Sequence, residues 1–348
     1  LMKRNQKNLF DFILLIIFVS VYNYQTKYET FDNKEFIKNV SLSLEDNQEI
    51  LLFESKNPFN FYDILNNLNN VSNQTVYGII TYPKSRKNKY PIILGVAGSA
   101  GWGEHHYKYL DSYNKMGIAT LALHSFESRG VTSTVGEQVS ATIPMVVHDA
   151  FSALNALNLN DKIDINKVGI TGWSFGGGVS LFTGWKPIMN KLSPNLKFAA
   201  HLPLYPPCVA KPDIPEFTDS PMHILIGELD NWVPAEPCDL LVSELKKLNY
   251  DNIDITIYED AHHSFDRTMD LRIAESAYRL EDCRLSLNDQ GVVSTDTFIK
   301  IPMKNSFMQK IGLMFCAERG PTWGGNEIAR SQSFQFAKSF FSTNLLND

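Results

Sequence analysis

Length, composition and charge limit the classes of protein to which this chain can belong. It has 348 residues, of which 44% are hydrophobic and 20% charged, the proportions of a globular protein with a substantial core and not of a disordered chain. The formal net charge is −6, and acidic and basic residues are mixed along the sequence, so neither a nucleic-acid-binding surface nor an acidic tail for a basic partner is indicated.

The amino-terminal residues have the pattern of an export signal. Three basic residues precede an apolar run over residues 12–19, and a basic stretch before a short apolar stretch is typical of a signal peptide. The run is shorter than the roughly 20 apolar residues of a membrane-spanning helix, and no small-x-small cleavage site follows it. We predict that residues 1–24 direct export to the periplasm or the extracellular space, either as a cleaved signal peptide or as an uncleaved membrane anchor over residues 8–22.

Residues 25–75 are rich in Asn, Lys, Asp and Glu and contain only short apolar patches. Asp46-Asn47 is typical of a turn, here between two possible edge strands. We interpret this part as a small extension that packs on the main domain.

From residue 76 onward, short apolar runs alternate with longer segments of helical spacing, which predicts parallel strands joined by crossover helices. The expected strands are 76–82, 91–96, 118–123, 167–171, 198–204, 223–226 and 253–258, and the expected helices are 103–116, 143–157, 176–185, 238–248 and 326–341. Several strands are apolar without alternation, as in sheets covered on both faces. We predict one doubly wound, mostly parallel α/β domain over residues 76–348, with a late excursion near 268–321.

A serine flanked by glycines stands at the end of one expected strand. Gly172-Trp173-Ser174-Phe175-Gly176 directly follows the apolar run that ends at Thr171. A nucleophilic serine at a strained turn from strand to helix requires glycine two residues away on either side, because a side chain there would collide with neighbouring backbone. The pattern is short enough to occur by chance, so it needs partners elsewhere in the chain.

Suitable partners follow the later strands. A serine hydroxyl needs a base to accept its proton and a third group to orient that base. Asp230 lies just after the expected strand 223–226, and His262 and His263 come just after 253–258. The order serine, aspartate, histidine is that of an α/β-hydrolase, and the carboxyl ends of parallel strands meet at one edge of a sheet.

Five stretches of the sequence together resemble the dienelactone hydrolase family of α/β-hydrolases, in an exported branch with a serine nucleophile, from about Asn57 to the end of the chain. The matching stretches are Val96-Ala97-Gly98-Ser99-Ala100-Gly101, His124-Ser125-Phe126-Glu127-Ser128-Arg129-Gly130, Thr171-Gly172-Trp173-Ser174-Phe175-Gly176-Gly177, Gly227-Glu228-Leu229-Asp230 with Pro234, and Tyr258-Glu259-Asp260-Ala261-His262-His263-Ser264-Phe265. The resemblance implies that His263, two places before the phenylalanine, is the base. It also implies that the backbone N–H groups of Ser99 and Phe175 form the oxyanion hole.

The chain departs from the family pattern in two places. The family's namesake enzyme has a cysteine at the position of Ser174, so cleavage of dienelactones does not follow from the resemblance. Ala97-Gly98 stands where the family usually has His-Gly, which removes a side chain that often braces the oxyanion loop.

Three further residues are candidates for substrate contacts. By resemblance, Arg129 faces the active-site side and holds a substrate carboxylate; the alternative is that it pairs with an acidic residue and fixes its own loop. Trp102 and Trp173 flank the oxyanion loop and the nucleophile, where they either provide an aromatic floor for an acyl or aryl group or serve packing alone.

Four cysteines, Cys208, Cys238, Cys283 and Cys316, have no Cys-x-x-Cys spacing, which argues against a zinc or iron-sulfur site. Their even number agrees with two disulfides in an exported protein or with four buried thiols, and the spacing does not give a connectivity. The resemblance implies a Cys208–Cys238 bridge, which leaves Cys283–Cys316 as a second bridge within the late excursion.

The predicted function is hydrolysis of a carboxylic ester through Ser174, His263 and Asp230, with no metal and no cofactor. One alternative keeps these residues but acts on a polymeric ester, because the glycine-rich turn also resembles that of cutinase-like polyesterases. A second alternative is a membrane-anchored binding protein that uses a hydrolase scaffold without turnover. The expected partner is a small-molecule or polymeric ester and not a nucleic acid.

Overall fold

The computed structural model describes residues 33–298 and 300–347. The expected signal or anchor, residues 1–24 with its core at 8–22, lies outside this range. Within the described range, no helix combines the length and the apolar character needed to cross a membrane.

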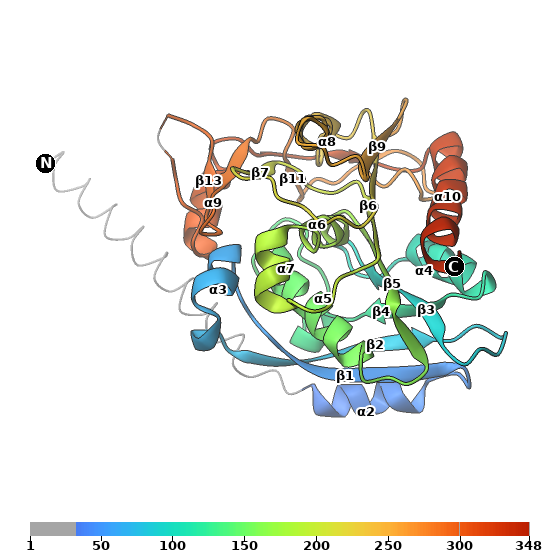
Figure 1. The fold of residues 1–348 in the computed structure, drawn as a ribbon. Helices are drawn as coiled ribbons and strands as arrows, with labels where there is room; N and C mark the ends of the chain where they lie inside the picture. Colours follow the sequence, from blue (N-terminus) through green and yellow to red (C-terminus); the bar gives the residue numbers. More distant parts are fainter. Residues whose placement is uncertain (1–32, 299, 348) are drawn as a thin grey trace, which may run out of the picture.

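An eight-stranded sheet forms the centre of the molecule (Figure 1). Its spatial order is β1-β2-β4-β3-β5-β6-β8-β9; β3, β4, β5, β6, β8 and β9 are parallel, and β2 runs antiparallel to both β1 and β4. The strands are β1 (Gln48–Lys56), β2 (Asn73–Thr81), β3 (Tyr90–Val96), β4 (Ala119–Leu123), β5 (Ile163–Trp173), β6 (Ala200–Leu204), β8 (Met222–Gly227) and β9 (Ile253–Tyr258). Every residue of β3, β4 and β6 is buried, as expected of strands covered on both faces.

Helices cover both faces of the sheet. Figure 1 shows α4 and α10 on one side and α5, α6 and α7 on the other. The helices are α2 (Lys34–Leu42), α3 (Phe61–Asn66), α4 (Glu104–Lys115), α5 (Ile143–Leu157), α6 (Phe175–Phe182), α7 (Lys186–Leu192), α8 (Ala235–Lys247), α9 (Ser306–Leu313) and α10 (Glu327–Phe341). The predicted doubly wound α/β fold, with a mostly parallel sheet between helices, is therefore confirmed.

Several local expectations are corrected. The segment before Asp46-Asn47 is not an edge strand but α2, in which Ile37 and Val40 have helical spacing and Ile37 is buried. The segment after the turn is β1, which pairs along its whole length with β2 and so joins the main sheet. The expected strand 76–82 lies antiparallel to its neighbours, since β2 is paired between β1 and β4.

The late excursion consists of short elements that pack over the carboxyl-terminal end of the sheet. It contains β10 (Arg272–Ile273), β11 (Tyr278–Arg279), β12 (Leu285–Leu287), β13 (Val293–Thr295), α9 and β14 (Glu318–Arg319), and β15 (Thr322–Trp323) follows it. β12 pairs with β13 and with β7 (Ala210–Pro212), a short strand that follows β6. Pairing with β7 attaches the excursion to the rest of the domain.

Candidate active site

The turn between β5 and α6 places Ser174 at the carboxyl edge of the sheet. Ser174 has φ 54° and ψ −112°, a strained backbone conformation for a residue with a side chain. A Cβ at Gly172 would lie 2.1 Å from the carbonyl oxygen of Gly176, and a Cβ at Gly176 would lie 2.0 Å from that of Val96. Only glycine fits at either position, which is the steric reason for the Gly-x-Ser-x-Gly pattern.

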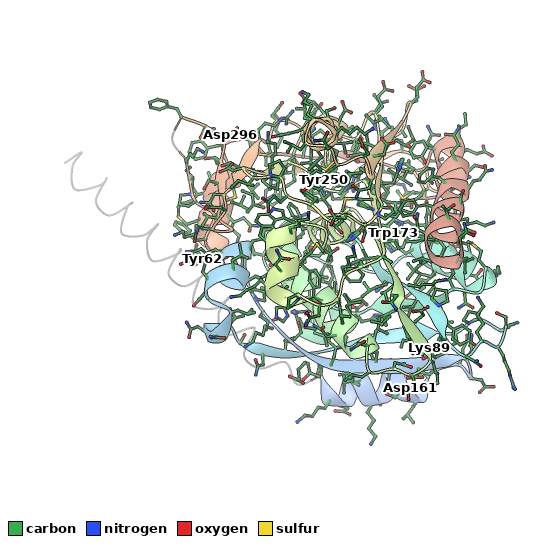
Figure 2. The ribbon with its side chains drawn as sticks, in the orientation of Figure 1. Tyr62, Lys89, Asp161, Trp173, Tyr250 and Asp296 are labelled. Atoms are coloured by element: carbon green, nitrogen blue, oxygen red, sulfur yellow. A yellow bond between two sulfur atoms is a disulfide. The ribbon has the colours of Figure 1, made fainter. Side chains whose placement is uncertain are left out.

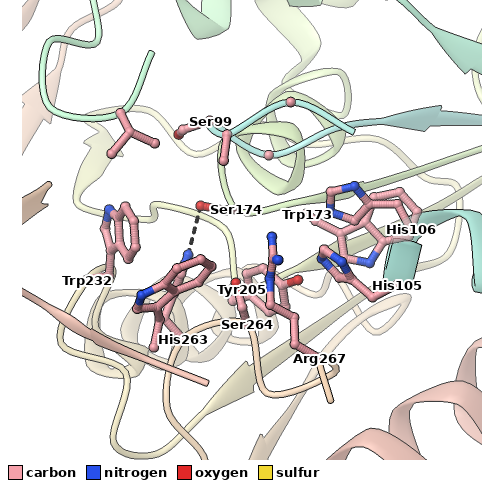
Figure 3. A pocket seen from close by; sticks show the side chains of 15 residues that line it. Ser99, His105, His106, Trp173, Ser174, Tyr205, Trp232, His263, Ser264 and Arg267 are labelled. Atoms are coloured by element: carbon pink, nitrogen blue, oxygen red, sulfur yellow. Dashed lines mark hydrogen bonds between the residues drawn. The ribbon is translucent and has the colours of Figure 1, made fainter. Parts of the chain in front are cut away.

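The side chains of Ser174, His263 and Asp230 form a continuous chain of hydrogen bonds, and Figure 3 shows the bond between Ser174 and His263. The Ser174 hydroxyl lies 2.9 Å from His263 Nε2, and His263 Nδ1 lies 2.7 Å from Asp230 Oδ2. With Nδ1 protonated, the imidazole donates to the carboxylate and can accept the hydroxyl proton. His262 turns elsewhere, and its Nδ1 bonds the Thr322 hydroxyl at 2.9 Å.

Asp230 is held by the loop after β8. Its Oδ1 accepts hydrogen bonds from the backbone N–H groups of Trp232 at 3.0 Å and Val233 at 2.9 Å. Oδ2 is thereby left for His263. Both the imidazole and the carboxylate are almost fully buried, which strengthens their mutual attraction.

Two aromatic rings pack on the imidazole of His263. Trp232 is inclined to it at a ring separation of 4.8 Å, and Tyr205 meets it edge-on, also at 4.8 Å. The Tyr205 hydroxyl donates to Asp266 Oδ1 at 2.9 Å, and burial raises the pKa of Asp266 to about 6. The ring of His263 is thus fixed by packing as well as by hydrogen bonds.

Ser174 and His263 open onto a cleft of about 340 Å³, its open mouth included, and Asp230 lies behind His263 outside the lining (Figure 3). Its lining is Gly98, Ser99, Ala100, Gly101, His105, His106, Val135, Trp173, Ser174, Tyr205, Trp232, His263, Ser264, Arg267 and Trp323. The sequence predictions included Ser99, Trp173, Ser174 and His263 from this set. They did not include Arg267, His105 or His106.

Arg267 is the positively charged group of the cleft lining. Its guanidinium lies 4.7 Å from the centre of the Trp323 ring, and among the described residues its Nε has no hydrogen-bond partner. Burial, with a smaller effect of Arg267, lowers the pKa of His105 to about 2, and burial lowers that of His106 well below its usual value. Both imidazoles are therefore neutral, and the guanidinium offers hydrogen-bond donors to a bound acceptor group. In the sequence, Arg267 stands four residues after His263, and this proximity is the signal that could have marked it as a residue of the site.

The two expected oxyanion-hole residues lie on either side of the nucleophile. Ser99 lines the cleft on the tight turn after β3, whose Gly101 has φ 77°. Phe175 is the first residue of α6, and N–H groups in the first turn of a helix have no acceptor within it. The Phe175 ring packs against Phe126 at 5.2 Å and does not line the cleft.

Arg129 does not line the cleft and pairs with an acidic residue, which is the alternative considered for it. The guanidinium is almost fully buried and donates to both carboxylate oxygens of Asp149, at 2.7 and 2.9 Å. It also donates to Asn57 Oδ1 and to the carbonyl oxygens of Ser125 and Lys56. Its hydrogen-bonding capacity is used within the protein.

The two tryptophans differ in position. Trp173 is fully buried near the middle of the molecule (Figure 2) and reaches the cleft beneath His106, with ring centres 4.5 Å apart. Trp102 donates its Nε1–H to the Leu123 carbonyl at 3.2 Å, stacks on Tyr107 and does not line the cleft. Packing accounts for Trp102.

Both expected disulfides are present. Cys208 is bonded to Cys238, and Cys283 to Cys316. Disulfides are typical of proteins from oxidising compartments, so the two bridges indicate an extracellular or periplasmic protein. Among the described residues, no three His, Cys, Asp or Glu side chains are grouped as metal ligands.

Comparison with protein families gives one match, to the model of the dienelactone hydrolase family, over residues 113–285. Through this segment the chain belongs to the dienelactone hydrolase family. The matched segment contains Ser174 and Asp230, and His263 also falls within it. Comparison with curated proteins finds no match.

Comparison with solved structures finds a protein of the same fold, with a TM-score above 0.5, and weaker alignments to two other hydrolases. A dienelactone hydrolase-like promiscuous phosphotriesterase from metagenomic libraries aligns with a TM-score of 0.52 and 14% identity, covering 86% of this chain and 99% of its own. A putative dienelactone hydrolase from Klebsiella pneumoniae aligns with a TM-score of 0.45 and 19% identity, covering 63% of this chain and 89% of its own. A thermophilic esterase from Thermogutta terrifontis aligns with a TM-score of 0.46 and 17% identity, covering 64% of this chain and 86% of its own.

Proposed function

We propose that the protein is a serine hydrolase of carboxylic esters, with Ser174 as nucleophile, His263 as general base and Asp230 as the group that orients it. The observation that carries this proposal is the pair of hydrogen bonds from the Ser174 hydroxyl to His263 and from His263 to Asp230. Membership in a hydrolase family supports it.

The proposed reaction proceeds through an acyl-enzyme. As Ser174 Oγ attacks the ester carbonyl carbon, His263 Nε2 accepts the hydroxyl proton and then transfers it to the leaving alcohol. Asp230 stabilises the imidazolium that forms in between. A water molecule, deprotonated by the same imidazole, attacks the acyl-enzyme, releases the carboxylic acid and restores the serine. The backbone N–H groups of Ser99 and Phe175 are the proposed donors to the oxyanion, and one such donor contributes about 2.7–4 kcal/mol to the transition state.

The shape of the cleft favours a small ester over a polymer. Ser174 is only 9% exposed and His263 only 2%, and the space in front of them measures about 340 Å³ even with its open mouth included. A polyester chain needs an open surface on which several repeat units can lie across the nucleophile. We therefore place small esters ahead of polymeric ones as the substrate.

A fluorophosphonate probe together with p-nitrophenyl acetate tests the proposal. The wild-type protein is expected to be labelled and to hydrolyse the ester, and Ser174→Ala to lose labelling and at least about 10⁴-fold in kcat/KM. Ser112→Ala, at a half-buried position of α4 outside the cleft lining, is the matched control and should behave as wild type. Labelling that persists in Ser174→Ala would assign the nucleophile elsewhere, and an unlabelled wild-type protein would favour the non-catalytic binding protein.

We also propose export through residues 1–24, supported by the two disulfides. Fractionation of cells that express the full chain, followed by determination of the amino-terminal residue, distinguishes a cleaved signal peptide from an uncleaved anchor.

A further inference from the structure

A second, larger cavity lies behind the nucleophile turn and outside the catalytic cleft. It has a volume of about 900 Å³, including the part open to solvent, and shares no lining residue with the cleft. Its walls come from α3, the start of α5, α6, β7 and the late excursion. The space is partly open to solvent. Close-packed protein interiors leave few voids larger than a water molecule, and ligand sites are concave and mostly apolar. A concave apolar space between these elements is therefore a candidate ligand site.

The lining is apolar. It includes Phe61, Ile143, Phe182, Leu285, Val293 and Leu313, and no charged side chain is among the described residues that line it. Three of the polar side chains in the lining are engaged within the wall itself: Asn60 Nδ2 donates to the Lys304 carbonyl, Thr142 Oγ1 to that of Pro58, and Gln309 Nε2 to that of Gln138. Because burying an unpaired charge is costly, this lining selects against a charged ligand.

The walls are cross-linked, which keeps the cavity from collapsing. Cys208 lies between the lining residues Pro207 and Val209, and its disulfide partner Cys238 belongs to α8. Cys283 lies between the lining residues Leu280 and Leu285, and its partner Cys316 follows Leu313 closely in sequence. Both disulfides thus anchor segments that form the wall, and a preformed site loses less entropy on binding.

One residue of the cavity lining is next to the nucleophile in sequence. Phe175, which directly follows Ser174, is one of the lining residues. A molecule in the cavity would contact the first turn of α6, on the side away from the catalytic cleft.

We propose that this cavity is a second binding site, separate from the catalytic cleft, for one uncharged apolar molecule such as a long-chain alcohol or the alkyl chain of a neutral lipid. The lining, its lack of charge and its cross-linked walls support this assignment. It does not depend on whether Ser174 hydrolyses esters.

The test uses N-phenyl-1-naphthylamine, an uncharged probe whose fluorescence rises in apolar surroundings. The wild-type protein is expected to bind it saturably. Val293→Phe and, independently, Ala210→Leu add side-chain volume to the lining and should weaken binding at least tenfold. Val40→Phe, on α2 and outside the lining, is the matched control and should bind as wild type. Hydrolysis of p-nitrophenyl acetate and circular dichroism establish that each variant is folded.

Two further experiments test the proposal without a variant of the cavity lining. Ser174→Ala should bind the probe as wild type does, because the two sites are separate; loss of binding there would place the probe in the catalytic cleft and overturn the proposal. At pH 8, 1-decanol should displace the probe from the wild-type protein at a concentration at least tenfold lower than decanoate. Equal displacement by the anion, absence of saturable binding, or equal weakening in Val40→Phe would also overturn it.

Discussion

The carbonyl oxygen of Ser99 accepts hydrogen bonds from the Thr134 backbone N–H at 2.8 Å and from the Ser133 hydroxyl at 3.1 Å. These contacts fix the peptide that follows the strand β3. The family resemblance led us to expect a histidine at the position of Ala97, with a side chain that braces this loop. Here the loop around residues 133 and 134 provides a brace instead, so the missing histidine does not leave Ser99 unsupported.

At the same scale, Asp230→Asn should show whether Asp230 orients His263 for catalysis or only maintains the folded structure of its loop. The asparagine oxygen can still accept from the Trp232 and Val233 N–H groups, as Asp230 Oδ1 does, so the loop should keep its structure. The amide then faces His263 Nδ1 without a negative charge and favours the wrong tautomer. We expect kcat for p-nitrophenyl acetate to fall about 10⁴-fold, with the melting temperature changed by only a few degrees. A variant with near wild-type kcat would remove Asp230 from the proposed triad.

The residues of the site differ in how far the sequence could predict them. Ser174 and His263 stand in motifs with fixed spacing to glycine and phenylalanine, so their approach could be anticipated. Arg129 and Arg267 carry the same charge and both lie near expected strand ends. Which of them meets an acid depends on Asp149, whose position beside Arg129 is set by the packing of α5 and not by any local pattern.

Helices and strands with long apolar periodicity were predicted well. The ends of two helices were predicted less well, because they depend on local backbone contacts. The helix expected over 176–185 ends at Phe182. After Phe182, the backbone N–H groups of Gly184 and Trp185 bond to the carbonyl oxygens three residues earlier, at 3.0 and 3.1 Å, so the helix closes in a tight turn. The helix expected from Cys238 begins at Ala235, with Pro237 in its first turn, where proline is tolerated because the N–H needs no helical acceptor.

The two disulfides provide a prediction about the elements that they join. The bonded cysteines are separated by 30 residues for Cys208–Cys238 and by 33 for Cys283–Cys316. If loop closure in the unfolded chain dominates, replacing either pair by alanine should lower the free energy of unfolding by about 2–5 kcal/mol, and by similar amounts for the two pairs. Urea denaturation of the two double variants measures this. A loss in one pair only would show that strain or local packing in the folded state decides the effect.

For the molecule as a whole, the sequence indicated that the proposed catalytic residues lie close together. It did not indicate how the late excursion packs around them. Parallel strands end at one edge, so groups that follow β5, β8 and β9 had to approach each other. The excursion lacked this constraint. β12 pairs in parallel with β7 across more than seventy residues of sequence through three residues only, and such short strands have no periodicity to detect. The cavity that these segments enclose could therefore not be anticipated.

Stability of the whole molecule should fall on acidification. Burial lowers the pKa of His148, His201 and His223 to about 4 and that of His105 to about 2. In the unfolded chain these groups titrate near 6.5. As pH falls below about 6.5, the unfolded chain binds protons that the folded protein does not, and the free energy of unfolding decreases until the folded-state pKa values are reached. Asp266 acts in the opposite direction, because its raised pKa lets the folded protein bind a proton first.

Calorimetry at pH 7.5 and 4.5 checks this sign, with the lower melting temperature expected at pH 4.5. His201→Gln should reduce the difference, since one buried imidazole with a pKa near 4 contributes on the order of 3 kcal/mol. Asp266→Asn should enlarge it by removing the opposing group. A melting temperature that rises on acidification would contradict the assignment of these histidines as buried neutral groups.

The ion pair between Arg129 and Asp149 makes two distant positions dependent on each other. Both side chains are almost completely buried, and deletion of one charge from such a pair costs about 3–5 kcal/mol because the other is left uncompensated. A descendant of this chain can dispense with the pair only by changing both residues, and whichever change occurs first produces a weakened ancestor. Divergence at positions 129 and 149 should therefore be slow and paired, even though neither side chain reaches the proposed chemistry.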